Sequence, residues 1–184
     1  MKELPKGINI VSISCGHSHA LLLSEDGQIF SFGAGMYGQL GIGPDDKLLS
    51  LTPIPVSLIN DSGDPVKHIA CDSHFSICYT ELGILYYWGM LNADDVEGIE
   101  WFPTFMNISL PKDLIEDDAF LYDFHLTDIQ ASFREVLAAD SSGRIYHCDL
   151  NFSQTLKPYR DDMQKSIGMA HKLMVGRSLK LFVE

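Results

Sequence analysis

The chain has 184 residues, of which 46% are hydrophobic, and its formal net charge is −12 at pH 7. This length and hydrophobic content are sufficient for one domain with a sizeable core. The excess of acidic residues repels a phosphate backbone over most of the surface, and no lysine or arginine cluster offsets it, which excludes direct DNA or RNA binding from the expected functions.

The first predicted elements are short strands joined by turns. Residues 11–15 alternate apolar and polar side chains, as a half-buried strand does, and residues 20–23 form an apolar run typical of a strand covered on both faces. Asp26-Gly27 then predicts a tight primed hairpin turn into a strand over residues 29–32. A fourth strand is predicted near residues 52–56, where prolines suit a strand start or a sheet edge.

This pattern repeats along the chain. The run from Cys15 to Gly33 lies without gaps over the run from Cys71 to Gly89, so that the two cysteines coincide and Phe32 falls on Trp88. A fainter copy covers residues 131–149. Repeats of this period are typical of solenoids, propellers and arrays.

The start of a fourth copy follows near the end of the chain, where residues 168–175 echo residues 16–23. We expect one repeat domain over residues 1–184, with units at about 8–64, 65–125, 126–163 and 164–184. Four short strands in each unit make a propeller blade. The predicted fold is therefore all-β, an incomplete propeller-type array of about three four-stranded blades and part of a fourth.

The first unit continues as Gly38-Gln39-Leu40-Gly41-Ile42-Gly43. Together with Gly16, His19, Gly27 and Phe32-Gly33, this run resembles the repeats of the regulator of chromosome condensation family. The second unit keeps the aromatic-glycine pair and lacks the glycine-rich run. The resemblance implies structural roles for the repeat positions Gly16, His19, Gly27, Gly33, Gly38, Gly41, Gly83, Trp88, Gly89, Gly143 and His171.

The family's propeller is normally seven-bladed, which at this period needs about 400 residues. A chain of 184 residues is then a fragment of a longer protein, a piece completed by partner chains, or an unusually short arc. The three alternatives stay open at this point. Each leaves strand edges that invite pairing, so each predicts a protein partner.

Residues that could carry chemistry have structural explanations. The cysteines Cys15, Cys71, Cys78 and Cys148 do not form the close pairs of a zinc site, and we expect them to be buried packing residues. A literal dinucleotide fingerprint begins at Gly33, but glycines and a proline follow it where a helix is needed. His17, His19 and His74 are expected to tie turns together. We therefore expect no enzyme activity, no cofactor and no metal.

Two acidic loops are the candidate binding surface. The first spans residues 91–101 and the second spans residues 115–118. An aromatic residue among carboxylates can anchor a basic partner, whereas the alternative is a solvated loop whose tryptophan fills the blade core. The candidate partner-binding residues are Asp94, Asp95, Glu97, Glu100, Trp101, Glu116, Asp117 and Asp118.

Three functions follow as hypotheses. The first is a non-catalytic interaction or scaffold module within a larger assembly. The second is implied by the family resemblance and is a guanine-nucleotide exchange factor for a small GTPase of the Ran type. The third is a targeting segment of a ubiquitin ligase or kinase, because the family's repeats also occur in such proteins.

The sequence also lacks the marks of secretion or membrane insertion. The first ten residues contain no apolar run of the signal-peptide kind, and no segment approaches the roughly 20 apolar residues that span a bilayer. We expect an intracellular protein of the cytoplasm or nucleus that is not secreted and does not bind membranes.

Overall fold

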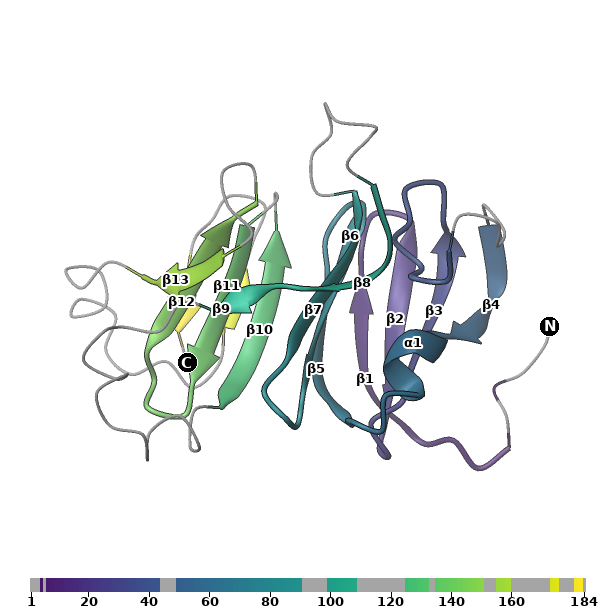
Figure 1. Cartoon of the computed structure of the whole chain (residues 1–184), viewed down its shortest axis with the longest axis horizontal. Helices are drawn as coiled ribbons and strands as arrows, with labels where there is room; N and C mark the ends of the chain where they lie inside the picture. Colours follow the sequence, from purple (N-terminus) through teal and green to yellow (C-terminus); the bar gives the residue numbers. More distant parts are fainter. Residues whose placement is uncertain are drawn as a thin grey trace. The chain divides into compact units, whose positions relative to one another are not determined.

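The computed structural model describes residues 4, 6–43, 49–90, 99–108, 125–132, 135–150, 155–159, 173–175 and 181–183, with strands in most of these segments (Figure 1). The chain divides into two compact units, Met1–Phe105 and Met106–Glu184. The first unit holds two blades and the second holds the remaining strands.

Blade 1 is a four-stranded antiparallel sheet in the order β1-β2-β3-β4, with each strand next to its neighbour in sequence. Its strands are β1 (Ile10–Cys15), β2 (His19–Ser24), β3 (Ile29–Ala34) and β4 (Leu49–Pro55). Hairpins between consecutive strands need no long crossover, which is why short strands close together in sequence form this sheet. A single helical turn, α1 (Ser57–Asn60), follows β4.

Blade 2 repeats the arrangement with the order β5-β6-β7-β8. Its strands are β5 (Val66–Cys71), β6 (Phe75–Thr80), β7 (Leu85–Met90) and β8 (Ile99–Phe105). The register is the same as in blade 1, since Ile13 pairs with Leu22 and Ile69 pairs with Cys78. The sequence repeat is therefore a repeat of strand pairing.

Each of the three inner hairpins also carries the same irregularity. The register shifts between Ile10 and Ser12, between Val66 and His68, and between Leu126 and Asp128. Such a bulge increases the local twist of a strand, and its recurrence makes it part of the blade design.

The hairpin turn differs in detail from the expected primed turn. In blade 1 the Ser24 N–H donates to the Gln28 carbonyl at 2.9 Å and the Gly27 N–H donates to the Ser24 carbonyl at 3.0 Å, which leaves three residues in the loop. A three-residue hairpin loop needs a positive φ only at its last residue, which is Gly27 with φ +79°. Gly83 and Gly143 take the same place with φ +86° and +78°.

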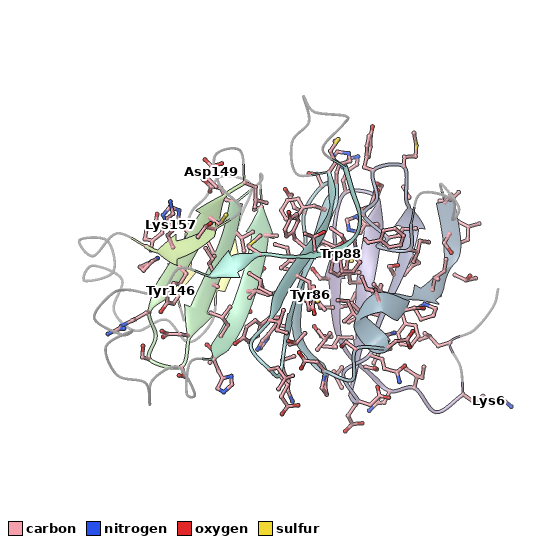
Figure 2. The ribbon with its side chains drawn as sticks, in the orientation of Figure 1. Lys6, Tyr86, Trp88, Tyr146, Asp149 and Lys157 are labelled. Carbon is pink, nitrogen blue, oxygen red and sulfur yellow. The ribbon has the colours of Figure 1, made fainter. Side chains whose placement is uncertain are left out.

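The first unit has its core between the two blades. Leu21, Leu23 and Ile29 of blade 1 share a buried cluster with Ile69, Cys78 and Trp88 of blade 2. Figure 2 labels Trp88 in the ribbon of this unit. Val56, which directly precedes α1, and Ile59 within α1 are buried in the same cluster. Alternation along the strands places one face of each blade in this core.

The second unit contains a third blade and a two-stranded sheet. The third blade has the order β10-β11-β12-β13, and β9 pairs with β13 in parallel. Its strands are β9 (Asn107–Ile108), β10 (Leu126–Ser132), β11 (Glu135–Asp140), β12 (Ile145–Asp149) and β13 (Thr155–Pro158), and the two-stranded sheet is β14 (Leu173–Val175) with β15 (Leu181–Val183).

The two-stranded sheet matches the predicted fourth unit. Met174 pairs with Phe182, as Leu22 pairs with Phe30 at the equivalent repeat positions. The prediction of an all-β protein made of four-stranded, propeller-type blades is therefore confirmed, with three such blades and a partial fourth. The short helix α1 was not predicted.

Candidate functional site

A network of buried polar groups joins the two blades of the first unit. The ring Nε2 of His19 lies 2.8 Å from the Ser76 hydroxyl, which donates to the Gln39 carbonyl at 2.9 Å. The indole Nε1 of Trp88 donates to the same carbonyl at 2.9 Å. Buried polar groups are stable only when they are paired, so this network holds the glycine-rich loop of blade 1 against blade 2.

His19 is 4% exposed and is held in its neutral form. Burial, and next the nearby His74, lowers the pKa of His19 to about 4, while Asp72 acts in the opposite direction. Because the Ser76 hydroxyl donates to Gln39, the neutral imidazole can donate its Nε2–H to Ser76 without placing a charge in the core. The predicted structural role of this histidine agrees with its position.

Two glycines of the loop let blade 2 side chains pack directly on its backbone. A Cβ on Gly41, which has φ +69°, would lie 2.7 Å from Trp88 Nε1, and a Cβ on Gly43 would lie 2.8 Å from the ring of Phe102. Both contacts require the absence of a side chain. The backbone of this loop is thus the surface on which two aromatic residues of the next repeat, Trp88 and Phe102, pack.

The literal dinucleotide fingerprint begins in β3 and continues into the same loop, and among the described residues up to Gly43 no helix follows it. Gly33 lies inside β3 with φ +106°, and residues 35–43 form turns and bends where a nucleotide site needs a helix. Without a helix N-terminus there is no arrangement of N–H groups for a pyrophosphate. Gly38 lies in a bend of this loop, whereas Gly33, which was expected to be a turn residue, lies in strand β3.

The short helix α1 is fixed to blade 1 by one side chain. The Asn60 Oδ1 accepts a 2.8 Å hydrogen bond from the Ile29 N–H, and its Nδ2 donates to the Ile29 carbonyl at 2.9 Å. These two hydrogen bonds take the place of a neighbouring strand at the first residue of β3. With Ile59 fully buried beneath it, α1 has little freedom to move.

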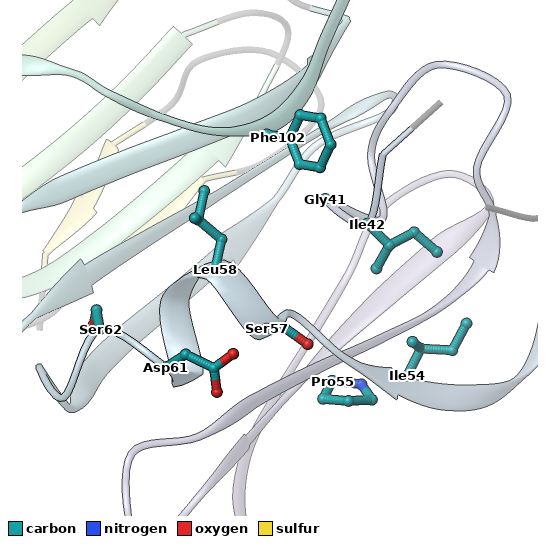
Figure 3. Close-up of a pocket in the computed structure, with 9 residues that line it drawn as sticks. All are labelled: Gly41, Ile42, Ile54, Pro55, Ser57, Leu58, Asp61, Ser62 and Phe102. Atoms are coloured by element: carbon teal, nitrogen blue, oxygen red, sulfur yellow. The ribbon is translucent and has the colours of Figure 1, made fainter. Parts of the chain in front are cut away.

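Beside α1 lies a pocket of about 630 Å³ within the first unit (Figure 3). This volume falls in the range of ligand-binding pockets. Leu58 of α1 and Phe102 of β8 project toward it from one side, and Ile42 and Ile54 line the other (Figure 3). The remaining lining residues are Gly41, Pro55, Ser57, Asp61 and Ser62.

Sequence reasoning did not single out this pocket. The spacing of Val56 and Ile59, with the exposed Leu58 between them, was a local signal for a helical turn. No local signal places Phe102 beside α1, because the two come from different blades. The pocket is a product of packing two repeats.

The predicted partner-binding residues are mostly outside the described residues. This holds for Asp94, Asp95, Glu97, Glu116, Asp117 and Asp118. Glu100 and Trp101 lie on β8, where Glu100 pairs with Gly89, so strand β8 begins before the end of the predicted loop. The binding role of these residues stays a prediction. Of the predicted repeat positions, His171 alone also falls outside the described part.

Three of the four cysteines, Cys71, Cys78 and Cys148, are buried, and Cys15 is exposed. Burial raises the pKa of the Cys71 thiol to about 12, and it also raises the pKa of Cys78 and that of Cys148, the last to about 11. Cys15 is exposed, contrary to the expected burial, whereas Cys71 at the equivalent repeat position packs against Ser14 of blade 1. A protonated buried thiol is a poor nucleophile.

Among the described residues, no group of three His, Cys, Asp or Glu side chains is placed to hold a metal ion. The helices of that part of the chain are also too short or too polar to cross a membrane. The features that distinguish the pocket beside α1 are its shape and its two exposed apolar side chains, Leu58 and Phe102.

The comparisons with known proteins agree with these features. Two models of the regulator of chromosome condensation (RCC1) repeat match residues 26–79 and residues 10–39. Human Protein RCC2 is 38% identical over 80 residues, and the human E3 ubiquitin-protein ligase HERC2 is 40% identical over 86 residues. These matches cover 44% and 46% of this chain but only 15% and 2% of those proteins.

Solved structures show the same fold. Human WBSCR16 aligns with a TM-score of 0.61 at 19% identity, over 84% of this chain and 40% of that one. Yeast RCC1 (Prp20), solved bound to Kap60, aligns with a TM-score of 0.57 at 25% identity, over 79% of this chain and 31% of that one. The two models thus identify RCC1 repeats at residues 10–79, and the described blades share the fold of the solved RCC1 structure.

Proposed function

We propose that this chain is a non-catalytic protein-interaction or scaffold module that acts within a larger assembly. One observation carries the proposal. Ile13 of β1 is 63% exposed, whereas Ile69, which holds the same place in blade 2, is buried in the core between the blades. Blade 1 therefore presents, at the exposed Ile13, the kind of surface that packs against another blade.

Other residues support a face rather than an isolated apolar side chain. Ile13 pairs with Leu22 and Leu22 pairs with Phe30, so all three point to one side of the sheet, where Leu22 and Phe30 are buried and Ile13 is exposed. Leu49 of β4 pairs with Ala34, which follows Phe30 by four residues on β3, and Leu49 is 57% exposed. Exposed apolar side chains grouped on one face mark interaction surfaces more often than scattered ones do.

The groups that could perform chemistry support the same proposal. His19 and Ser76 are hydrogen-bonded to each other between the two blades, and Cys71 and Cys78 are buried as protonated thiols. Free cysteines are also usual in a reducing compartment, which fits an intracellular location in the cytoplasm or nucleus.

Affinity capture from extract of the native cell tests the proposal. The bait is the whole chain, compared with an Ile13→Glu/Leu49→Glu double variant and with Leu82→Glu, which changes an exposed leucine in a hairpin turn of blade 2. We expect a fixed set of proteins to be retained by the wild type and by Leu82→Glu and lost from the double variant. Equal retention by all three would contradict the role of this face.

The first alternative is exchange of guanine nucleotide on a small GTPase of the Ran type. The similarity to yeast RCC1, at 25% identity over 79% of this chain, favours testing it. Exchange requires a surface that fits the nucleotide-free GTPase better than the loaded one, and it needs no catalytic side chain. Catalytic amounts of the chain would then accelerate release of fluorescent GDP from purified Ran-type GTPase, and capture of that GTPase would increase in EDTA.

The second alternative is the targeting segment of a ubiquitin ligase or kinase. The 40% identity to human HERC2 over 86 residues favours it. A continuous reading frame that joins these repeats to a ligase or kinase domain on one transcript would support this alternative. A stop codon directly after Glu184 would remove it.

A further inference from the structure

Two exposed apolar side chains of the first unit meet at the pocket beside α1. Leu58 is 54% exposed and Phe102 is 51% exposed, and both line it (Figure 3). Each stands on a rigid support, because Asn60 ties α1 to β3 and the ring of Phe102 packs on Gly43. A preformed pocket binds with little cost in ordering its own side chains.

The rim of the pocket is acidic. Asp61 follows Leu58 by three residues and its side chain lies at the edge of the pocket (Figure 3). The lining residues include no lysine, arginine or histidine, and no cation pairs with Asp61 in the part of the chain that the structure describes. With the net charge of −12 around it, this carboxylate favours a basic group on the ligand.

Strand addition is a poor explanation for binding here. The outer strand β4 contributes Ile54 and Pro55 to the pocket, and it contains Pro53 and Pro55. Prolines have no N–H group, so this edge cannot offer a continuous row of donors to an added strand. Recognition must come from a side chain that enters the pocket.

We propose that this pocket binds a protein segment that places one leucine- or phenylalanine-sized side chain between Leu58 and Phe102, and an arginine or lysine on Asp61. Apolar anchors in a preformed pocket are the usual energetic centre of such contacts, and the charge sets the orientation. This site adds a peptide-binding surface to the proposed interaction module. Neither Ile13 nor Leu49 of the exposed face of blade 1 lines the pocket. The experiments can therefore reject the pocket proposal without rejecting the blade-face proposal, and the reverse.

Fluorescein-labelled hexapeptides and the whole chain test this inference by fluorescence anisotropy. The probes carry one phenylalanine and one arginine separated by zero, one or two serines, and their controls replace phenylalanine with serine or arginine with glutamate. We expect the best phenylalanine–arginine probe to bind at least about tenfold tighter than either of its controls. Binding of that probe should also weaken with added salt.

Three protein variants assign the binding to the pocket. Leu58→Asp should weaken the best probe about tenfold or more, while Leu82→Asp, at an exposed leucine outside the pocket, should leave it unchanged. Asp61→Lys should invert the preference, so that the glutamate probe binds better than the arginine probe. Thermal unfolding of each variant checks that it is folded.

The proposal is overturned if none of the probes binds, if Leu58→Asp and Leu82→Asp bind alike, or if Asp61→Lys keeps the arginine preference. If the Ile13→Glu/Leu49→Glu variant still retains its partners while these probes behave as expected, the blade face is wrong and the pocket stands. The reverse pattern would reject the pocket alone.

Discussion

The indole nitrogen of Trp88 donates a hydrogen bond to the carbonyl oxygen of Gln39, so the aromatic residue of one repeat is held by the glycine-rich loop of the repeat before it. This relationship explains why the second sequence repeat (about residues 65–125) can lack a glycine-rich loop of its own and still keep Trp88-Gly89. The third unit, which follows the repeat without that loop, has Cys148 at the position of Trp88. The glycine-rich loop of the first repeat thus supports an aromatic residue of the second repeat.

Trp88→Phe is expected to lower the free energy of unfolding by about 2 kcal/mol. The variant loses one buried hydrogen bond and leaves a cavity beside the loop, while Ser76 still donates to the Gln39 carbonyl. Urea unfolding followed by circular dichroism measures the change. Leu82→Ala, at an exposed position, is the control and should change it by less than about 0.5 kcal/mol. An unaltered midpoint for Trp88→Phe would show that the loop contact is not stabilising.

The hairpin glycines should differ in their sensitivity to alanine. Both have positive φ, which costs about 1 kcal/mol for a residue with a Cβ. At Gly27 the new Cβ would also lie 2.5 Å from the Pro65 Cβ, whereas at Gly83 its nearest neighbour is the Tyr79 hydroxyl at 3.5 Å. Gly27→Ala should therefore destabilise the protein clearly more than Gly83→Ala in chemical unfolding. Equal losses would mean that Pro65 moves aside, and no loss at either position would contradict the turn assignment.

Stability should fall as the pH drops from about 6.5 to about 4, in part because of His19. The pKa of His19 is lowered to about 4 in the folded state, with burial as the main cause, so the unfolded chain binds a proton that the folded chain does not. The stability associated with neutral His19 is fully present above the pKa of histidine in the unfolded chain. It is lost as the pH falls below that value, and the full loss is about 3 kcal/mol.

Because other groups titrate in the same range, the measurement is the difference between the wild type and His19→Gln. Glutamine can keep a hydrogen bond to Ser76 and does not titrate. The difference in unfolding free energy between the two proteins should narrow between pH 6.5 and pH 4. A difference that stays constant with pH would mean that His19 titrates normally.

Trp101→Ala tests the acidic-loop hypothesis. If Trp101 and the carboxylates near it form a binding face, the substitution should weaken partner capture with little change in the unfolding midpoint. Trp101 lies on β8, whose backbone pairs with β7. Loss of folding would instead show that the tryptophan belongs to the blade core, which was the alternative interpretation of this loop.

The strands and their register were predictable because they depend on local pattern. Alternation in β1, the apolar run in β2 and a glycine at the end of each hairpin loop are properties of neighbouring residues, and the gap-free repeat carried them from blade 1 to blade 2. In the two-stranded sheet near the end of the chain, Met174 lies opposite Phe182. The loop length of the hairpin was misjudged by one residue, because Asp-Gly suits both turn types.

The candidate pocket was not predictable in the same way. The contacts of Phe102 with Gly43 and of Trp88 with Gly41 join residues far apart in the chain, and they form only when one blade packs on the next. The sequence by itself determined the strands of each blade and their repeat motif, since hydrogen-bonded hairpins and their turns are encoded within each repeat. Tertiary structure alone decided which apolar side chains remain outside, because burial depends on what lies opposite each face.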